Sequence, residues 1–153
     1  MGELCLKKVV KTERMVMKNC YYIDSRGPDG EQLQWAVKLF LSKIKVKKMI
    51  IAVPQKWNLE GPVRNYLGET VTEELIESER SGLDGIKLYL MTKKSGPIES
   101  FQGAVIMIYP TSDLMDRVDD LEEVSDVLMI PWSEEQIIEW VPRWNAMEIV
   151  SQK

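Results

Sequence analysis

Residues 104–115 have the sequence AVIMIYPTSDLM, a continuous apolar run that breaks into a proline and then into residues that start helices. Similar apolar runs occupy Met49–Pro54, Ile86–Met91 and Val127–Ile130, and three of the four runs lead into helical patterns. Strands that are buried on both faces read as such runs rather than as alternating sequences. The pattern therefore predicts a three-layer α/β fold, Rossmann-like or flavodoxin-like, in which a mostly parallel sheet of about five strands carries helices on both faces.

Capping signals predict where the helices begin. Asp29 precedes an amphipathic pattern that runs to Ile44, and Thr111–Asp113 precede another. Ser133 and Gln136 have the spacing of a capping box, in which Trp132 is placed to pack on Ile137.

Between the first two runs, the expectations are less regular. A short helix is expected at Leu59–Leu67, and a second capping box at Thr70 and Glu73 predicts a helix from about Val71 to Arg80. Residues 81–85 are expected to form the loop that closes this helix.

The length of 153 residues fits a single domain, 1–153, with a core large enough to need no disulfide or metal. Residues 20–23 are the expected first strand, and residues 1–18 form either an arm or an edge strand. The chain shows no signal peptide and no apolar run that could span a bilayer, so a cytoplasmic location without a membrane partner is expected.

The chain contains no histidine, which excludes Ser-His-Asp and Cys-His nucleophiles, His-ligated zinc and imidazole acid–base catalysis. No phosphate-binding loop, dinucleotide fingerprint or calcium loop occurs either. Cys5 and Cys20 match no metal or redox spacing, and the net charge of −4 makes nucleic acid an unlikely partner. We expect no metal site, the sequence implies no particular cofactor, and the balance leans away from an enzyme.

A ligand site is expected at the carboxyl ends of the strands, where loops and helix starts converge in open α/β sheets. Loop position assigns nine candidate ligand-binding residues to this rim: Gln55, Lys56, Thr92, Lys93, Ser95, Thr111, Ser112, Asp113 and Ser133. Trp57 and Trp132 project to the same rim. A polar or phosphorylated small molecule could bind there. The alternative is that the Ser and Thr residues are helix caps and the lysines are surface charges.

The tryptophans allow a second hypothesis. Core packing explains most of the five, but an exposed Trp140 or Trp144 in the last helix would mark a surface for a partner protein or a homo-oligomer. The first functional hypothesis is thus a small-molecule or regulatory binding domain, the second is an interaction or oligomerisation module, and the third is an enzyme using Lys and Asp chemistry.

One family resemblance is present in residues 21–55. The aromatic strand, Gly27–Gly30, the long helix that contains Ala36 and the run Ile50–Val53 resemble the start of the C-terminal α/β domain of pyruvate kinases. The resemblance implies a layered fold. It ends at Pro54–Trp57, where that family would have a phosphate loop, so it implies no site residue.

Overall fold

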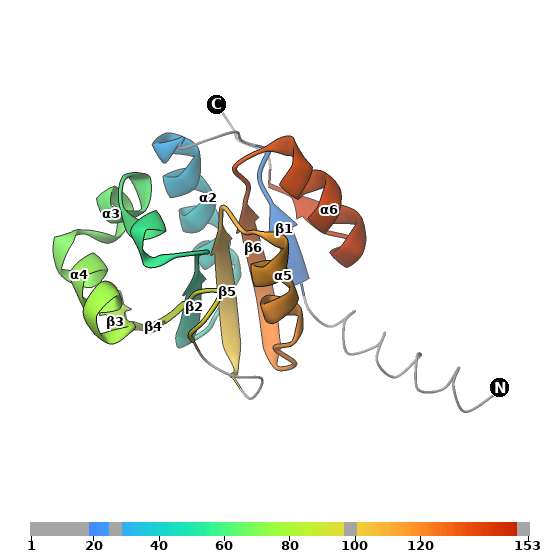
Figure 1. The fold of residues 1–153 in the computed structure, drawn as a ribbon. Coiled ribbons are helices and arrows are strands. Elements are labelled where there is room, and N and C mark those ends of the chain that lie inside the picture. The colour runs from blue at the N-terminus through green and yellow to red at the C-terminus, as the bar shows by residue number, and fades with distance from the viewer. Residues whose placement is uncertain (1–18, 25–28, 97–100, 150–153) are drawn as a thin grey trace.

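A computed structural model describes residues 19–24, 29–96 and 101–149, which form one sheet with helices on both faces (Figure 1). The strands are β1 (Asn19–Tyr22), β2 (Lys48–Ala52), β3 (Arg80–Leu83), β4 (Ile86–Met91), β5 (Gly103–Ile108), β6 (Val124–Ile130) and β7 (Met147–Glu148). The helices are α2 (Gly30–Lys43), the 3-10 helix η1 (Lys56–Leu59), α3 (Pro62–Leu67), α4 (Glu69–Ser78), α5 (Ser112–Asp119) and α6 (Glu134–Trp144).

The strand order is β3-β4-β2-β5-β6-β1-β7, and every neighbouring pair is parallel except the antiparallel pair β3 and β4. The predicted α/β class and mostly parallel sheet are therefore confirmed, with seven strands rather than five. The first strand, β1, lies between β6 and β7 near one edge of the sheet, whereas the classic Rossmann order places it at the centre.

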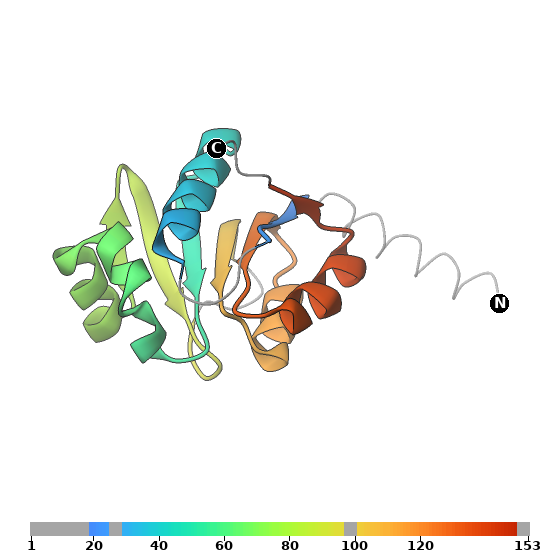
Figure 2. The ribbon, with the colours of Figure 1, turned by 90° about the horizontal axis from the view of Figure 1, so that it is seen from above.

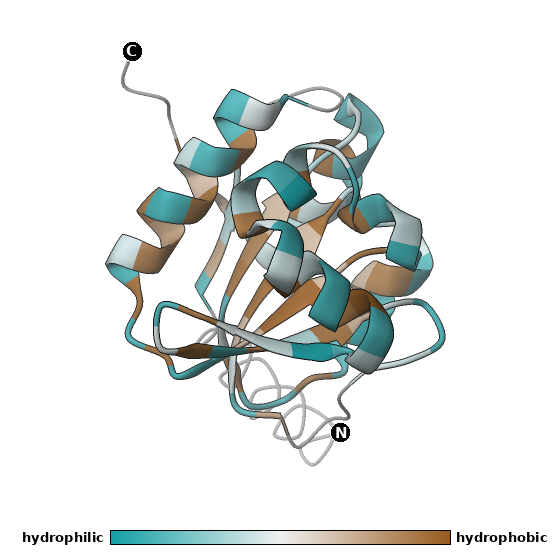
Figure 3. Cartoon of the chain, turned by 90° about the vertical axis from the view of Figure 1, so that its left-hand side faces the viewer, coloured by the Kyte–Doolittle hydropathy of each residue, from teal (hydrophilic) through white to brown (hydrophobic). Residues whose placement is uncertain are grey.

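Both faces of the sheet are buried, as the apolar runs predict. Ile51 pairs with Leu90 and Ile106 and belongs to one core, whereas its neighbour Ile50 belongs to the other. Helices α2, α3 and α4 contribute to the first core and α5 and α6 to the second, so they cover opposite faces (Figure 2). Figure 3 shows the hydrophobic strands enclosed by helices that carry hydrophilic residues outward.

Three helix starts are as predicted. The Asp29 carboxylate accepts a hydrogen bond from the Gln32 amide at 3.1 Å, and Thr111 caps α5. Ser133 caps α6 and forms the capping box with Gln136. Local sequence is sufficient at these positions because a cap needs only residues within one helical turn.

The start predicted for α4 is wrong. The helix begins at Glu69 after Gly68, whose φ of 92° supplies the break, and Thr70 lies exposed within the first turn. Glu73 does not reach back to the backbone, because its carboxylate binds Arg64 at 2.6 Å instead. The ion pair with Arg64, which lies outside this helix, thus replaces the backbone hydrogen bond that the predicted capping box requires of Glu73.

The predicted loop at residues 81–85 is also wrong. Residues 80–83 form β3, and Asp84 and Gly85 make a two-residue turn into β4 with φ values of 51° and 82°. Positive φ at both positions is typical of the hairpin turn that Asp-Gly favours. The Asp-Gly turn signal is present in the sequence. The four residues of β3, however, are too few and too polar to show the alternation of apolar and polar side chains that indicates a strand.

One expectation concerns residues outside the described part of the chain: the arm or edge strand at 1–18, with Cys5. Within the described ranges, no helix combines the length and the apolar character that crossing a membrane requires.

Candidate functional site

A cavity of about 460 Å³ opens beyond the carboxyl ends of β2, β5 and β6. The chain leaves β2 toward α3 on one face of the sheet and leaves β5 and β6 toward α5 and α6 on the other. Connections that diverge in this way leave a crevice between neighbouring strands, the usual ligand position in such sheets. The cavity is lined by Trp57, Asn58, Glu60, Gly61, Pro62, Tyr109, Trp132 and Gln136.

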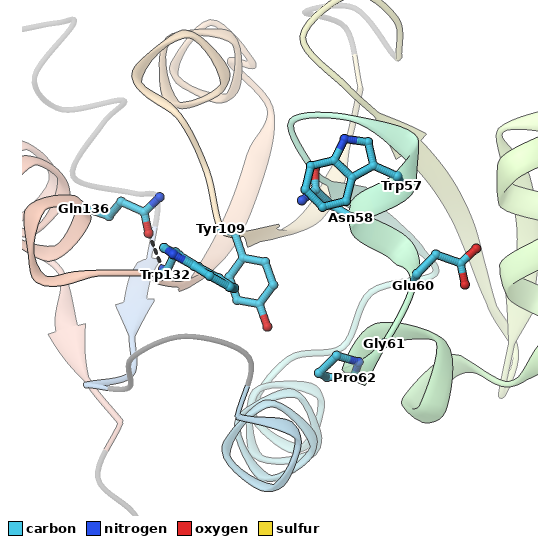
Figure 4. A pocket seen from close by; sticks show the side chains of 8 residues that line it. All are labelled: Trp57, Asn58, Glu60, Gly61, Pro62, Tyr109, Trp132 and Gln136. Atoms are coloured by element: carbon cyan, nitrogen blue, oxygen red, sulfur yellow. Dashed lines mark hydrogen bonds between the residues drawn. The ribbon is translucent and has the colours of Figure 1, made fainter.

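Aromatic rings form opposite sides of this cleft (Figure 4). Trp57 lies on one side, the Tyr109 and Trp132 rings lie on the other, and Pro62 closes a third side. Trp57 is 67% exposed and Trp132 is 50% exposed. These two large apolar side chains thus stay accessible to solvent at a hollow in the surface.

Tyr109 has the most unusual backbone in the cleft. Its φ of 53° is in the left-handed region, which ends β5 and turns the ring out of the strand's register. Its hydroxyl is buried and has no hydrogen-bond partner among the described residues. Burial, with a smaller contribution from the Asp29 carboxylate, raises the pKa of this hydroxyl above its ordinary value. A protonated hydroxyl without a partner among the described residues is therefore buried next to the cleft.

Trp132 packs edge-to-face on Tyr109, with ring centroids 5.1 Å apart and planes at 80°. Trp132 is 50% exposed, and its ring contact is to Tyr109; the predicted packing of Trp132 onto Ile137 stays a prediction. The Tyr109 ring is available because the chain turns at the end of β5, which the sequence pattern does not reveal.

Gln136 holds the two loops of this wall together. Its side-chain oxygen accepts hydrogen bonds from the backbone amides of Trp132 and, at 3.4 Å, of Ser133. Its side-chain nitrogen donates to the Pro110 carbonyl at 2.5 Å. The loop after β5 and the loop after β6 are thus joined by one side chain.

The opposite wall is fixed from within its own turn. The Trp57 indole nitrogen donates to the Gln55 side-chain oxygen at 2.6 Å. The Gln55 backbone N–H donates to the Asn58 side-chain oxygen at 2.9 Å. Both bonds restrict the rotamers of residues that line the cleft. The amide nitrogen of Asn58 and the indole nitrogen of Trp132 remain as possible donors to a ligand.

The charges next to the cleft are arranged around Arg64. Its guanidinium binds Glu60 at 2.6 Å, Glu69 at 2.8 Å and Glu73 at 2.6 Å. The hydrogen bond from Arg64 lowers the pKa of the Glu60 carboxyl, so Glu60 stays ionised. In Figure 4 the Glu60 carboxylate points away from Tyr109 and Trp132. Among the described residues that line the cleft, none is basic.

None of the nine predicted ligand residues is in the lining of the cleft. Thr111 and Ser133 are helix caps, and Gln55 supports Trp57. The Ser112 hydroxyl donates to Glu139 at 2.8 Å, and Asp113 is exposed in the first turn of α5.

The loop after β4 is self-contained. Thr92 is 8% exposed, and its hydroxyl bonds the hydroxyl of Ser95 at 3.0 Å and accepts from the amides of Lys94 and Ser95. Arg117 donates to the carbonyls of Thr92 and Ser95 at 2.6 and 2.9 Å. Lys93 is exposed. This loop therefore has the hydrogen bonds of a folded turn rather than of an open site.

Lys56 turns away from the cleft. Its amino group donates to the Ile76 carbonyl at 2.8 Å and lies 3.5 Å from Glu79, at the end of α4. These partners of Lys56 do not include Asp113, and the hypothesis of Lys and Asp chemistry, which also allows Lys93, stays a prediction. Within the described residues, no cluster of Cys, Asp and Glu could hold a metal ion.

Sequence reasoning identified the rim, and it projected Trp57 and Trp132 to it. The sequence does not indicate a site role for Tyr109, which is expected only to end a strand, or for Gln136, which is expected only to form a cap. Sequence reasoning also missed the lining segment from Asn58 to Pro62, where Gly61 has a φ of 75° before the proline that starts α3.

The last helix is packed inward. Trp140 is 1% exposed and belongs to the core formed with α5, and Trp144 is partly buried against the same core. Trp140 therefore presents no surface to a partner. The exposed large apolar residue of α6 is Ile138, at 65%.

No family model matches the chain, and no curated protein matches it. Among solved structures, the large terminase from a thermophilic bacteriophage is similar, with 11% identity and a TM-score of 0.49 over 86% of this chain. The chain spans 39% of the length of that terminase chain. The resemblance of residues 21–55 to pyruvate kinases stays a prediction.

Proposed function

We propose that this protein is a non-catalytic domain that binds a small molecule by holding a flat ring of that molecule between Trp57 and the Tyr109–Trp132 pair. The observation that carries the proposal is the aromatic cleft at the crevice beyond β2, β5 and β6. Its volume of about 460 Å³ falls within the range of about 300–1,000 Å³ that is usual for ligand pockets.

The energetic support comes from the exposed rings. Stacking of a base on an aromatic side chain stabilises a complex by about 1–3 kcal/mol. A ring that entered the cleft would cover apolar surface of Trp57 and Trp132 that now faces water. Because hydrogen bonds already restrict Trp57 and the loop of Trp132, little side-chain entropy is lost on binding.

The polar groups support binding rather than chemistry. Asn58 and Trp132 can orient a ligand through hydrogen bonds, but the described lining contains no nucleophile beside a base. A regulatory or carrier role follows from such a site. The cytoplasmic location expected from the sequence is part of this proposal and rests on the sequence alone.

The test is a screen of flat heteroaromatic fragments by thermal shift and by two-dimensional NMR of the indole N–H groups. Trp57→Ala should abolish the response to a hit. Ile138→Ala is the matched control, because it removes an exposed apolar side chain that is not part of the cleft. A hit whose response survives Trp57→Ala but not Ile138→Ala would move the site to α6 and favour the interaction module.

A further inference from the structure

We infer that the ring held in the aromatic cleft carries a positive charge, so that the ligand is an organic cation rather than a phosphorylated metabolite. This inference rests on the proposed function and specifies its ligand class. Three features carry it: the cations of the wall formed by η1 and α3 are already bound, carboxylates lie in that wall and at the helix starts of the rim, and the lining is rich in aromatic rings.

The first feature is the absence of a cation for an anionic ligand in the described part of the rim wall formed by η1 and α3. Arg64 is held by three carboxylates at 2.6 to 2.8 Å. Lys56 is bound at the far end of α4. A phosphate would have to break one of these arrangements to find a positive partner, since helix dipoles supply only about half an elementary charge each.

The second feature is the sign of the surrounding charge. In the cluster around Arg64, three carboxylates, those of Glu60, Glu69 and Glu73, face one guanidinium. On the Trp132 side, Glu134 and Glu135 occupy the first turn of α6. Asp113 lies in the first turn of α5. The Asp29 carboxylate, at the start of α2, contributes to the raised pKa of the Tyr109 hydroxyl. Full negative charges at these helix starts outweigh the dipoles that would otherwise attract an anion.

The third feature is the lining itself. A cation over the face of Trp or Tyr is attracted by the negative potential of the ring, by about 0.5–1 kcal/mol at exposed sites. The cleft brings two tryptophans and a tyrosine together. A flat cation gains both this attraction and the stacking that a neutral ring would gain, and the nearby carboxylates add to the preference.

The experiment compares three bicyclic rings of nearly the same shape and different charge at pH 7: N-methylquinolinium (positive), quinoline (neutral) and quinoline-4-carboxylate (negative). Binding to the full chain is measured from the indole N–H shifts of Trp57 and Trp132. We expect N-methylquinolinium to bind roughly two- to fivefold more tightly than quinoline, and the carboxylate to bind most weakly. Higher salt should reduce this difference, because salt screens exposed charges.

The outcomes separate the two proposals. If quinoline or its carboxylate binds as tightly as the cation, through Trp57 and Trp132, the charge inference is wrong and the aromatic site stands. If none of the three rings shifts the signals of Trp57 and Trp132 at its solubility limit, both proposals fail. Loss of N-methylquinolinium binding in Trp57→Ala, with binding retained in Ile138→Ala, completes the positive result.

Discussion

Trp140 and the pair Trp57 and Trp132 show two uses of the same side chain. Trp140 is 1% exposed between α6 and the sheet, and its ring belongs to the second core. Trp57 and Trp132 are 67% and 50% exposed at a cleft; the Trp57 indole donates to Gln55, and the Trp132 backbone amide donates to Gln136 of α6. The core tryptophan stabilises the fold by its burial, whereas the two rim tryptophans contribute little to stability and remain available to a ligand.

This difference separates stability from binding. A substitution in the core should change the free energy of unfolding and affect binding only through the fold. A substitution at the rim should change binding with a small effect on unfolding. The variants below test that separation, in order of decreasing expected effect on stability.

Trp140→Ala should lower the free energy of unfolding by about 3–5 kcal/mol, since it leaves a large cavity under α6. Urea unfolding followed by far-ultraviolet circular dichroism measures this loss. A loss below about 1 kcal/mol would show that the ring is not packed in the core, and it would restore Trp140 as a surface residue.

Gln136→Ala should cost about 1–2 kcal/mol, because the capping box and the bond to the Pro110 carbonyl are lost together. It should also weaken ligand binding by separating the loops that carry Tyr109 and Trp132. Gln136→Glu is the control: it keeps the acceptor for the Trp132 and Ser133 amides and removes the donor to Pro110, so it should cost about half as much. Equal losses in the two variants would show that the link to Pro110, rather than the cap, is the main contribution.

Trp132→Ala should cost about 1 kcal/mol, which is the typical strength of the edge-to-face pair that it forms with Tyr109. Ligand binding should be lost. Trp132→Phe keeps a ring at this position and should recover most of both quantities. Stability measured by urea unfolding and binding measured by NMR titration should change by unequal amounts, and a loss of stability as large as that of Trp140→Ala would remove the distinction between the two regions.

Trp57→Ala should change the free energy of unfolding by less than about 0.5 kcal/mol, as is usual for an exposed residue. The same variant should weaken binding of a flat ring at least about tenfold if stacking contributes about 1.4 kcal/mol or more. Isothermal calorimetry on the variant and on Ile138→Ala gives the comparison. Unchanged affinity in Trp57→Ala would show that Trp57 is not part of the binding site.

Much of the fold follows from local sequence. The apolar runs that became β2, β4, β5 and β6 are identifiable because a strand buried on both faces needs apolar side chains at every position. The strands β3 and β7 are short edge strands whose existence depends on a neighbour to pair with. β3 has four residues and β7 has two, and segments this short contain no sequence pattern that predicts their pairing.

The site is less predictable because its lining depends on side-chain direction. Tyr109 enters the cleft through a left-handed φ at the end of β5, and Lys56 leaves it to bind a carbonyl 20 positions away. Topology indicates the rim, since parallel strands end at one edge of the sheet. Which residue of each loop faces the cavity is determined by these individual backbone turns and distant partners.

The central claim is that the rim tryptophans bind the ligand while the core tryptophan holds the fold. The most direct test is a two-dimensional spectrum of the five indole N–H groups, assigned with single Trp→Phe variants, during titration with N-methylquinolinium. The account predicts that the signals of Trp57 and Trp132 move along a saturable curve while that of Trp140 stays in place. Movement of Trp140 or Trp144 with Trp57 and Trp132 unchanged would contradict it.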